Sequence, residues 1–69
     1  MVLNREIPKI SMEAARVNAR LTQSQAAAKL GITPETLRRY EKGKSSPSMQ
    51  TVEKLCSIYQ YPQDYIFFP

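Results

Sequence analysis

The stretch "QAAAKLGITPETLRRY", residues 25–40, decides the fold. It reads as a helix that stops at Gly31, a short turn, and a second helix that begins at Thr33 and Pro34. Glycine just past the end of one helix and proline at the first position of the next are common signals of helix ends. The stretch therefore predicts two short helices joined by a tight turn.

The residues around this turn fit two helices that cross at roughly a right angle, as in a helix-turn-helix. Ala27 lies where the helices would cross, and only a small side chain lets their backbones approach there. Gly31 supplies the left-handed backbone that the turn needs. Ile32 fills the corner, and Leu37 and Tyr40 face back toward the core. These constraints are met together, so the motif is more specific than a lone glycine or a basic run.

Working outward, the first four predicted helices each begin with a serine or threonine whose side-chain oxygen can accept a hydrogen bond from a free backbone N–H group. These capping residues are Ser11, Thr22, Thr33 and Ser48. The final "PQDYIFFP", residues 62–69, predicts a short last turn or helix followed by an extended tail. The sequence therefore predicts an all-α fold, a compact bundle of about five short helices.

The predicted organisation is an N-terminal arm over residues 1–10, a helical domain over 11–66 and a C-terminal tail over 67–69. The segments "REIPKI" and "YIFF" near the two ends are rich in β-favouring residues. Two alternatives follow from them. Either the tails pair as two short strands, or "IFFP", residues 66–69, forms a contact between two copies of the chain.

Basic residues gather in the middle of the chain. The formal net charge is +4, and residues 16–44 hold seven lysines and arginines against two glutamates. This local excess is larger than the net charge, so the flanks are slightly acidic. Such a segment favours a polyanionic partner, and a solvated basic face is the alternative explanation.

The composition excludes several classes of function. The chain has no His and a single Cys, Cys56, so it lacks the commonest general base and metal ligand and cannot form an internal disulfide. We therefore expect no enzymatic activity, no metal and no cofactor. The first residues carry no apolar secretion signal, and no stretch approaches membrane-spanning length, which predicts a cytoplasmic protein with no membrane partner.

The second helix of the motif, residues 33–43, is amphipathic about Leu37. Tyr40 and Glu41 fall on the same side as Leu37, and long polar side chains point the opposite way. That exposed face suits a helix that enters the DNA major groove, and an ordinary amphipathic surface helix is the alternative. The outward residues are Glu35, Arg39 and Lys42, with Arg38 to one side and Thr36 to the other.

Two charged residues lie within apolar stripes. Arg16 falls between Met12 and Ala19 on one face of the first helix. Glu41 falls near Leu37 on the inward face of the helix predicted over residues 33–43. A lone buried charge is very costly, whereas a buried pair with hydrogen bonds is tolerated. The sequence therefore predicts that Arg16 and Glu41 meet as a structural ion pair.

Residues 16–66 resemble the Cro/repressor-type helix-turn-helix (XRE) family. The matching features are Arg16, "LTQ" at 21–23, Ala27, "LGIT" at 30–33, "YEKGK" at 40–44, "PS" at 47–48, and Val52 with Leu55 before Tyr61 and Ile66. The resemblance implies a lambda-repressor-like bundle and sequence-specific binding of double-stranded DNA. It also implies a small transcriptional regulator of phage or mobile-element type, and the same pairing of Arg16 with Glu41.

The resemblance implies one set of residues that contact the DNA backbone. The position of Gln23, at the start of the helix that ends at Gly31, holds a phosphate in the family. Those of Thr33, Lys42 and Lys44 lie near the backbone.

A second set faces base edges in the family, at the positions of Pro34, Glu35 and Arg39. Pro34 departs from the pattern, because it has no N–H group to donate and is reduced to apolar contact. Glu35 either accepts from cytosine N4 or orients Arg39 through an i,i+4 pair. Arg39, with or without Arg38, reads guanine O6 and N7. Thr36 belongs to the same exposed surface.

Three functions compete at this point. The first is a DNA-binding regulator that acts as a homodimer on a palindromic operator, without a small-molecule effector. The second is a MerR-like or excisionase winged helix, since "TPETLRRYEKGKSSP" also fits that motif, although Lys44 stands where its wing needs an apolar residue. The third is a protein-interaction module of the same fold, resembling an antirepressor or antitoxin.

Overall fold

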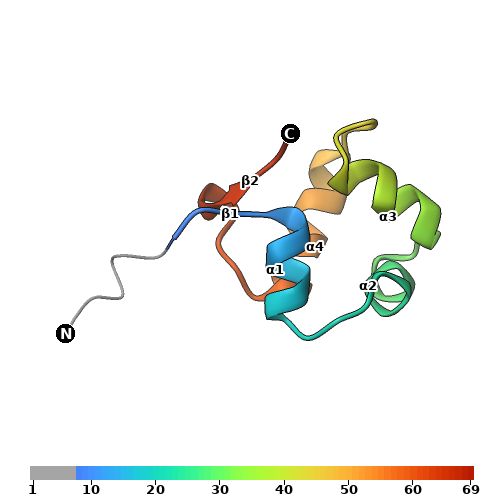
Figure 1. Cartoon of the computed structure of the whole chain (residues 1–69), viewed down its shortest axis with the longest axis horizontal. Coiled ribbons are helices and arrows are strands. Elements are labelled where there is room, and N and C mark those ends of the chain that lie inside the picture. Colours follow the sequence, from blue (N-terminus) through green and yellow to red (C-terminus); the bar gives the residue numbers. More distant parts are fainter. Residues whose placement is uncertain (1–7) are drawn as a thin grey trace.

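A computed structural model describes residues 8–69 (Figure 1). The elements in chain order are β1 (Ile10–Ser11), α1 (Met12–Asn18), α2 (Gln23–Leu30), α3 (Pro34–Glu41), α4 (Met49–Tyr59), the 3-10 helix η2 (Gln63–Tyr65) and β2 (Ile66–Phe67). The described residues thus contain four α-helices and one 3-10 helix. This arrangement confirms the predicted all-α bundle of short helices, with a small strand pair added to it.

Each α-helix begins where its capping residue predicts. The side chains of Ser11, Thr22, Thr33 and Ser48 accept hydrogen bonds from backbone N–H groups three residues further on. At Thr22 the cap is reciprocal, because the Gln25 side chain accepts from the Thr22 backbone N–H at 2.9 Å. These bonds satisfy donors that a helix end otherwise leaves free.

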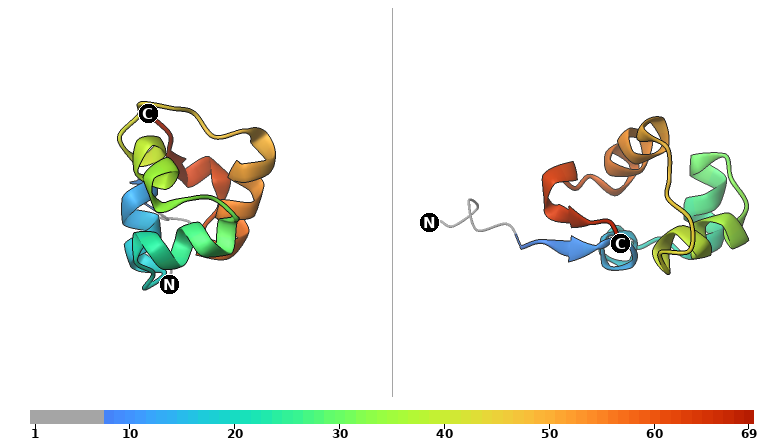
Figure 2. Two further views of the ribbon diagram at one scale, coloured as in Figure 1. Left: turned by 90° about the vertical axis from the view of Figure 1, so that its right-hand side faces the viewer. Right: turned by 90° about the horizontal axis from the view of Figure 1, so that it is seen from above.

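The turn between α2 and α3 has the geometry that the sequence predicts. Gly31 ends α2 with φ at 74°, in the left-handed region that favours glycine. The Ile32 backbone N–H donates to the Ala27 carbonyl at 3.0 Å, which folds the turn back over the last turn of α2. Ala27 has no exposed surface, so its methyl group is enclosed where the two helices pack. The two helices form one end of the molecule (Figures 1 and 2).

The core lies between α1, α2, α4 and the inner face of α3. Leu37 and Leu55 have no exposed surface, and Met12 is almost fully enclosed. Tyr40 and Tyr61 are only partly buried at the edge of this cluster. In so small a core each of these side chains carries a large share of the apolar burial.

β1 and β2 lie side by side at the end of the molecule opposite α2 and α3 (Figure 1). β1 and β2 pair in parallel, with Ile10 opposite Ile66 and Ser11 opposite Phe67, which confirms the predicted strand pairing. Ile66 is 3% exposed and belongs to the core, whereas Phe67 is largely exposed. The alternative contact between two copies through residues 66–69 stays a prediction. Residues 1–7 of the predicted N-terminal arm lie outside the described part of the chain.

The third helix ends earlier than the sequence suggests. We expected Gly43 to stop it, but α3 ends at Glu41, and Lys42 is its cap. Gly43 instead makes the turn that follows, with φ at 77°. A Cβ atom at Gly43 would lie 3.1 Å from Cβ of Pro69, so the C-terminal residue packs against this turn. None of the helices within residues 8–69 is both long and apolar enough to span a bilayer.

Candidate nucleic-acid interface

A buried polar network stands behind the helix-turn-helix. Arg16 Nε on α1 donates to Glu41 Oε2 on α3 at 2.8 Å, and the two side chains are 9% and 3% exposed. Arg16 Nη1 also donates to the Leu21 carbonyl at 3.0 Å, in the loop that leads to α2. One guanidinium therefore ties together α1, the α1–α2 loop and the end of α3.

Gln23 is the third member of this network. Its Nε2 donates to Glu41 Oε1 at 2.9 Å, so the first residue of α2 is tied to the last residue of α3. The resemblance assigned Gln23 to a DNA phosphate. Its amide nitrogen has two hydrogens, and the bond to Glu41 uses one of them. Sequence reasoning missed this bond, because nothing in the spacing of residues 23 and 41 indicates it.

The Tyr59 hydroxyl is buried beside the ion pair. Tyr59 is 2% exposed, and its hydroxyl has no hydrogen-bond partner within the described residues. Burial, together with the nearby Glu41 carboxylate, raises the pKa of Tyr59 to about 12. Burial also raises the pKa of the Cys56 thiol. Both groups are therefore neutral at physiological pH, and we assign neither to the site.

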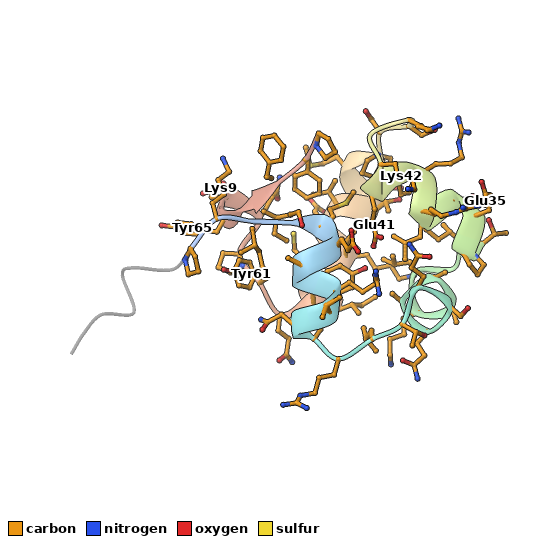
Figure 3. The ribbon with its side chains drawn as sticks, viewed as in Figure 1. Lys9, Glu35, Glu41, Lys42, Tyr61 and Tyr65 are labelled. Carbon is orange, nitrogen blue, oxygen red and sulfur yellow. The ribbon has the colours of Figure 1, made fainter. Side chains whose placement is uncertain are left out.

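The outward face of α3 and the loop behind it make a shared hollow of about 240 Å³. In Figure 3, Glu35 and Lys42 lie on this outer side of α3, and Glu41 points toward the interior. The hollow is lined by Glu35, Arg38, Arg39, Lys42 and Lys44. Four cations thus surround one carboxylate, and the balance of charge favours an anionic partner.

The ion pair on this face differs from the expected one. One of the two alternatives for Glu35 was that it orients Arg39 at i,i+4, but in the structure Glu35 pairs with Arg38 at i,i+3. The hydrogen bond from Arg38, and then its charge, lower the pKa of the Glu35 carboxyl below its ordinary value. Arg39 instead donates from Nε to Ser45 Oγ at 3.2 Å. Both spacings are compatible with a helical pair, so the sequence left the choice open.

The remaining predicted residues lie at the start of α3. Thr33 caps the helix and accepts from the Thr36 backbone N–H at 3.1 Å. The two threonine hydroxyls are 2.9 Å apart. Pro34 occupies the first helical turn and is exposed beside Glu35. The start of α3 therefore presents two hydrogen-bonded threonines and an exposed proline ring.

A helix, a glycine turn and a second helix with exposed cations define the class of helix-turn-helix proteins. The family model HTH_3, described as "Helix-turn-helix", matches residues 12–66. The chain belongs to this family, as its resemblance to Cro/repressor-type sequences predicts. After Gly43 the chain forms a loop and then α4, with no hairpin between them, which argues against the winged-helix alternative.

Two relatives are similar over most of this chain. The cryptic phage CTXphi transcriptional repressor RstR of Vibrio cholerae is 43% identical over 47 residues, which cover 68% of this chain and 42% of RstR. Multiprotein-bridging factor 1a of Arabidopsis thaliana is 40% identical over 50 residues, which cover 72% of this chain and 34% of that protein. The chain spans less than half the length of these curated relatives.

Proposed function

We propose that this protein binds double-stranded DNA in a sequence-specific manner, with α3 in the major groove. The observation that carries the proposal is the cationic hollow on the outer face of α3, the second helix of the helix-turn-helix. Major-groove readers of this class place the first turns of the second helix against base edges. The cations at the end of α3 and in the loop behind it supply attraction to phosphates.

The proposed contacts divide into two sets. Thr33, Lys42, Lys44 and the second amide hydrogen of Gln23 contact the sugar–phosphate backbone and set the position of the protein on the duplex. Base edges are met by residues further out on α3. These base-facing residues are Pro34, Glu35, Thr36 and Arg39, with Arg38 at the margin.

We further propose that the protein is a transcriptional regulator of phage type that acts in the cytoplasm as a homodimer on a palindromic operator. The similarity to RstR, whose name describes a phage transcriptional repressor, supports this role. Two half-sites one helical turn apart would match a two-fold symmetric dimer.

A mobility-shift titration over a range of salt concentrations tests DNA binding directly. We expect affinity for random duplex DNA to fall steeply with salt, because each phosphate contact releases counterions. Lys44→Ala should reduce the slope of log K against log salt by about one and weaken binding equally on all sequences. Lys9→Ala is the matched control, because Lys9 lies at the opposite end of the molecule (Figure 3) and should leave the slope unchanged.

A second candidate function is protein interaction through the same fold. The similarity to a protein named a multiprotein-bridging factor favours it. A pure interaction module has no reason to release counterions from DNA. A wild-type protein that shows no steeply salt-dependent binding to random duplex DNA and selects no site from a random pool would support this candidate and overturn the first.

A further inference from the structure

We infer that Ser45 is a positioning residue for base recognition, which holds the Arg39 guanidinium so that both of its terminal nitrogens face a guanine. This inference rests on the proposed function and names a determinant of its specificity. Ser45 itself reads no base in this scheme. It acts through Arg39, whose Nε donates to Ser45 Oγ at 3.2 Å.

The loop after α3 brings Ser45 to this position. The Gly43 backbone N–H donates to the Tyr40 carbonyl at 3.1 Å, and the Lys44 backbone N–H donates to the Arg39 carbonyl at 2.9 Å. Gly43 turns the chain with a positive φ that other residues adopt only with strain. These bonds return the loop over the last turn of α3, so Ser45 is partly buried beside the stem of Arg39.

The bond at Nε decides which donors of Arg39 remain for DNA. A guanidinium has five N–H groups, one on Nε and four on the two terminal nitrogens. With Nε engaged by Ser45, the two terminal nitrogens have no partner within the described part of the chain. They form a fork that matches guanine O6 and N7, the commonest specific contact in the major groove.

Arg38 lacks this arrangement, although it is the neighbouring residue on the same helix. Its Nη2 is paired with the Glu35 carboxylate, so one of its terminal nitrogens is already occupied. A guanine that approached Arg38 would have to displace an anion, whereas a guanine that approached Arg39 would meet two free donors. The two arginines are therefore unequal, and Ser45 together with Glu35 makes them so.

The test compares variants on DNA that the wild type itself selects from a random duplex pool. Arg39→Ala first identifies the base pair whose preference depends on Arg39. Ser45→Ala, Ser45→Thr and Ser46→Ala are then titrated against the selected site and its single-base variants at one salt concentration. Ser46 is the matched control, because it is the adjacent exposed serine of the same loop. Circular dichroism and thermal melts establish that each variant is folded.

We expect Ser45→Ala to lower the preference for guanine at that base pair about threefold to tenfold, the range of one net hydrogen bond. Non-specific affinity should be unchanged, because no charge is lost. Ser45→Thr keeps the hydroxyl and should keep the preference, as should Ser46→Ala. Replacing the guanine with 7-deazaguanine should cost the wild type more affinity than it costs Ser45→Ala, because only a positioned fork uses N7 fully.

Two results would overturn the inference while the proposed function stands. One is a Ser45→Ala protein that discriminates the base variants as well as the wild type. The other is a Ser45→Ala protein that loses affinity equally on every sequence, since that describes a backbone contact or a structural role. A wild-type protein that selects no DNA site would overturn the proposed function, and this inference with it.

Discussion

Residues 8–69 contain two ion pairs of the same chemistry in opposite surroundings. Arg16 and Glu41 pair inside the domain, where their side chains are 9% and 3% exposed. Glu35 and Arg38 pair on the outer face of α3, where 61% and 52% of their side chains are exposed. The buried pair has further partners in Leu21 and Gln23.

The difference shows how burial assigns a role to a charge. A charge that is buried away from water needs hydrogen-bonding or charged partners. Removing one member of a buried pair therefore leaves the other as an unpaired buried charge. A surface pair exchanges its partner for water at little cost. The buried pair therefore stabilises the fold, while the exposed pair lies on the face that we propose contacts DNA.

The largest expected effect is on the buried side of this comparison. Arg16→Ala should destabilise the domain by about 3–5 kcal/mol, because it leaves the Glu41 carboxylate buried without its cation. Thermal or urea unfolding measures the change. Arg38→Ala is the matched control, since it removes an arginine from the exposed pair and should leave the midpoint close to that of the wild type. If the two variants unfolded at the same midpoint, the buried pair would contribute no more to stability than the exposed pair.

A second effect depends on pH and arises beside the same network. The folded protein raises the pKa of Tyr59 from its ordinary 10 to about 12, so the folded state retains a proton that the unfolded state releases. The free energy of unfolding keeps its full value below pH 10. It should fall by roughly 2–3 kcal/mol as the pH rises to 12, because ionisation of Tyr59 favours the unfolded state. Tyr59→Phe should abolish this alkaline loss. Urea titrations of both proteins between pH 9 and 12 measure this difference. If the wild type and Tyr59→Phe lost the same unfolding free energy as the pH rose, the loss would not arise from Tyr59.

On the exposed face the expected effect is on binding. Arg39→Ala should cost about 1–3 kcal/mol on the selected site and relax the preference at one base pair in each half-site. Non-specific affinity should fall only by the loss of one charge. Paired titrations on the site and its single-base variants measure both quantities. If Arg38→Ala relaxed the preference and Arg39→Ala did not, the reading residue would be Arg38.

The smallest expected effect concerns the stability contributed by the exposed pair. Glu35→Gln removes the carboxylate and keeps the shape, and the midpoint of thermal unfolding should not change measurably at neutral pH. The pKa of Glu35 is lowered, so its contribution would be lost as the pH falls through that lowered value. A clear drop in midpoint at neutral pH would show that solvent exposure does not weaken this pair. The same variant leaves Arg38 without its carboxylate partner. A new preference for guanine in this variant would show that the unpaired Arg38 contacts a base.

Sequence reasoning succeeded where a feature depends on neighbouring residues or on a steep penalty. The caps at Ser11, Thr22, Thr33 and Ser48 rest on hydrogen bonds that span three residues, and the turn at Gly31 rests on one backbone angle. The pairing of Arg16 with Glu41 was predictable at a separation of 25 residues, because few arrangements tolerate a buried charge.

The sequence by itself therefore determined the helices, the turn between α2 and α3, and which residues face inward. Only the tertiary structure decided that Gln23 bonds to Glu41, that Glu35 pairs with Arg38 instead of Arg39, and that β1 and β2 pair in parallel. The physical reason is the size of the competing free energies. Exposed long side chains such as Glu35 have alternative partners that differ by less than about 1 kcal/mol, and contacts between distant segments depend on how the helices pack.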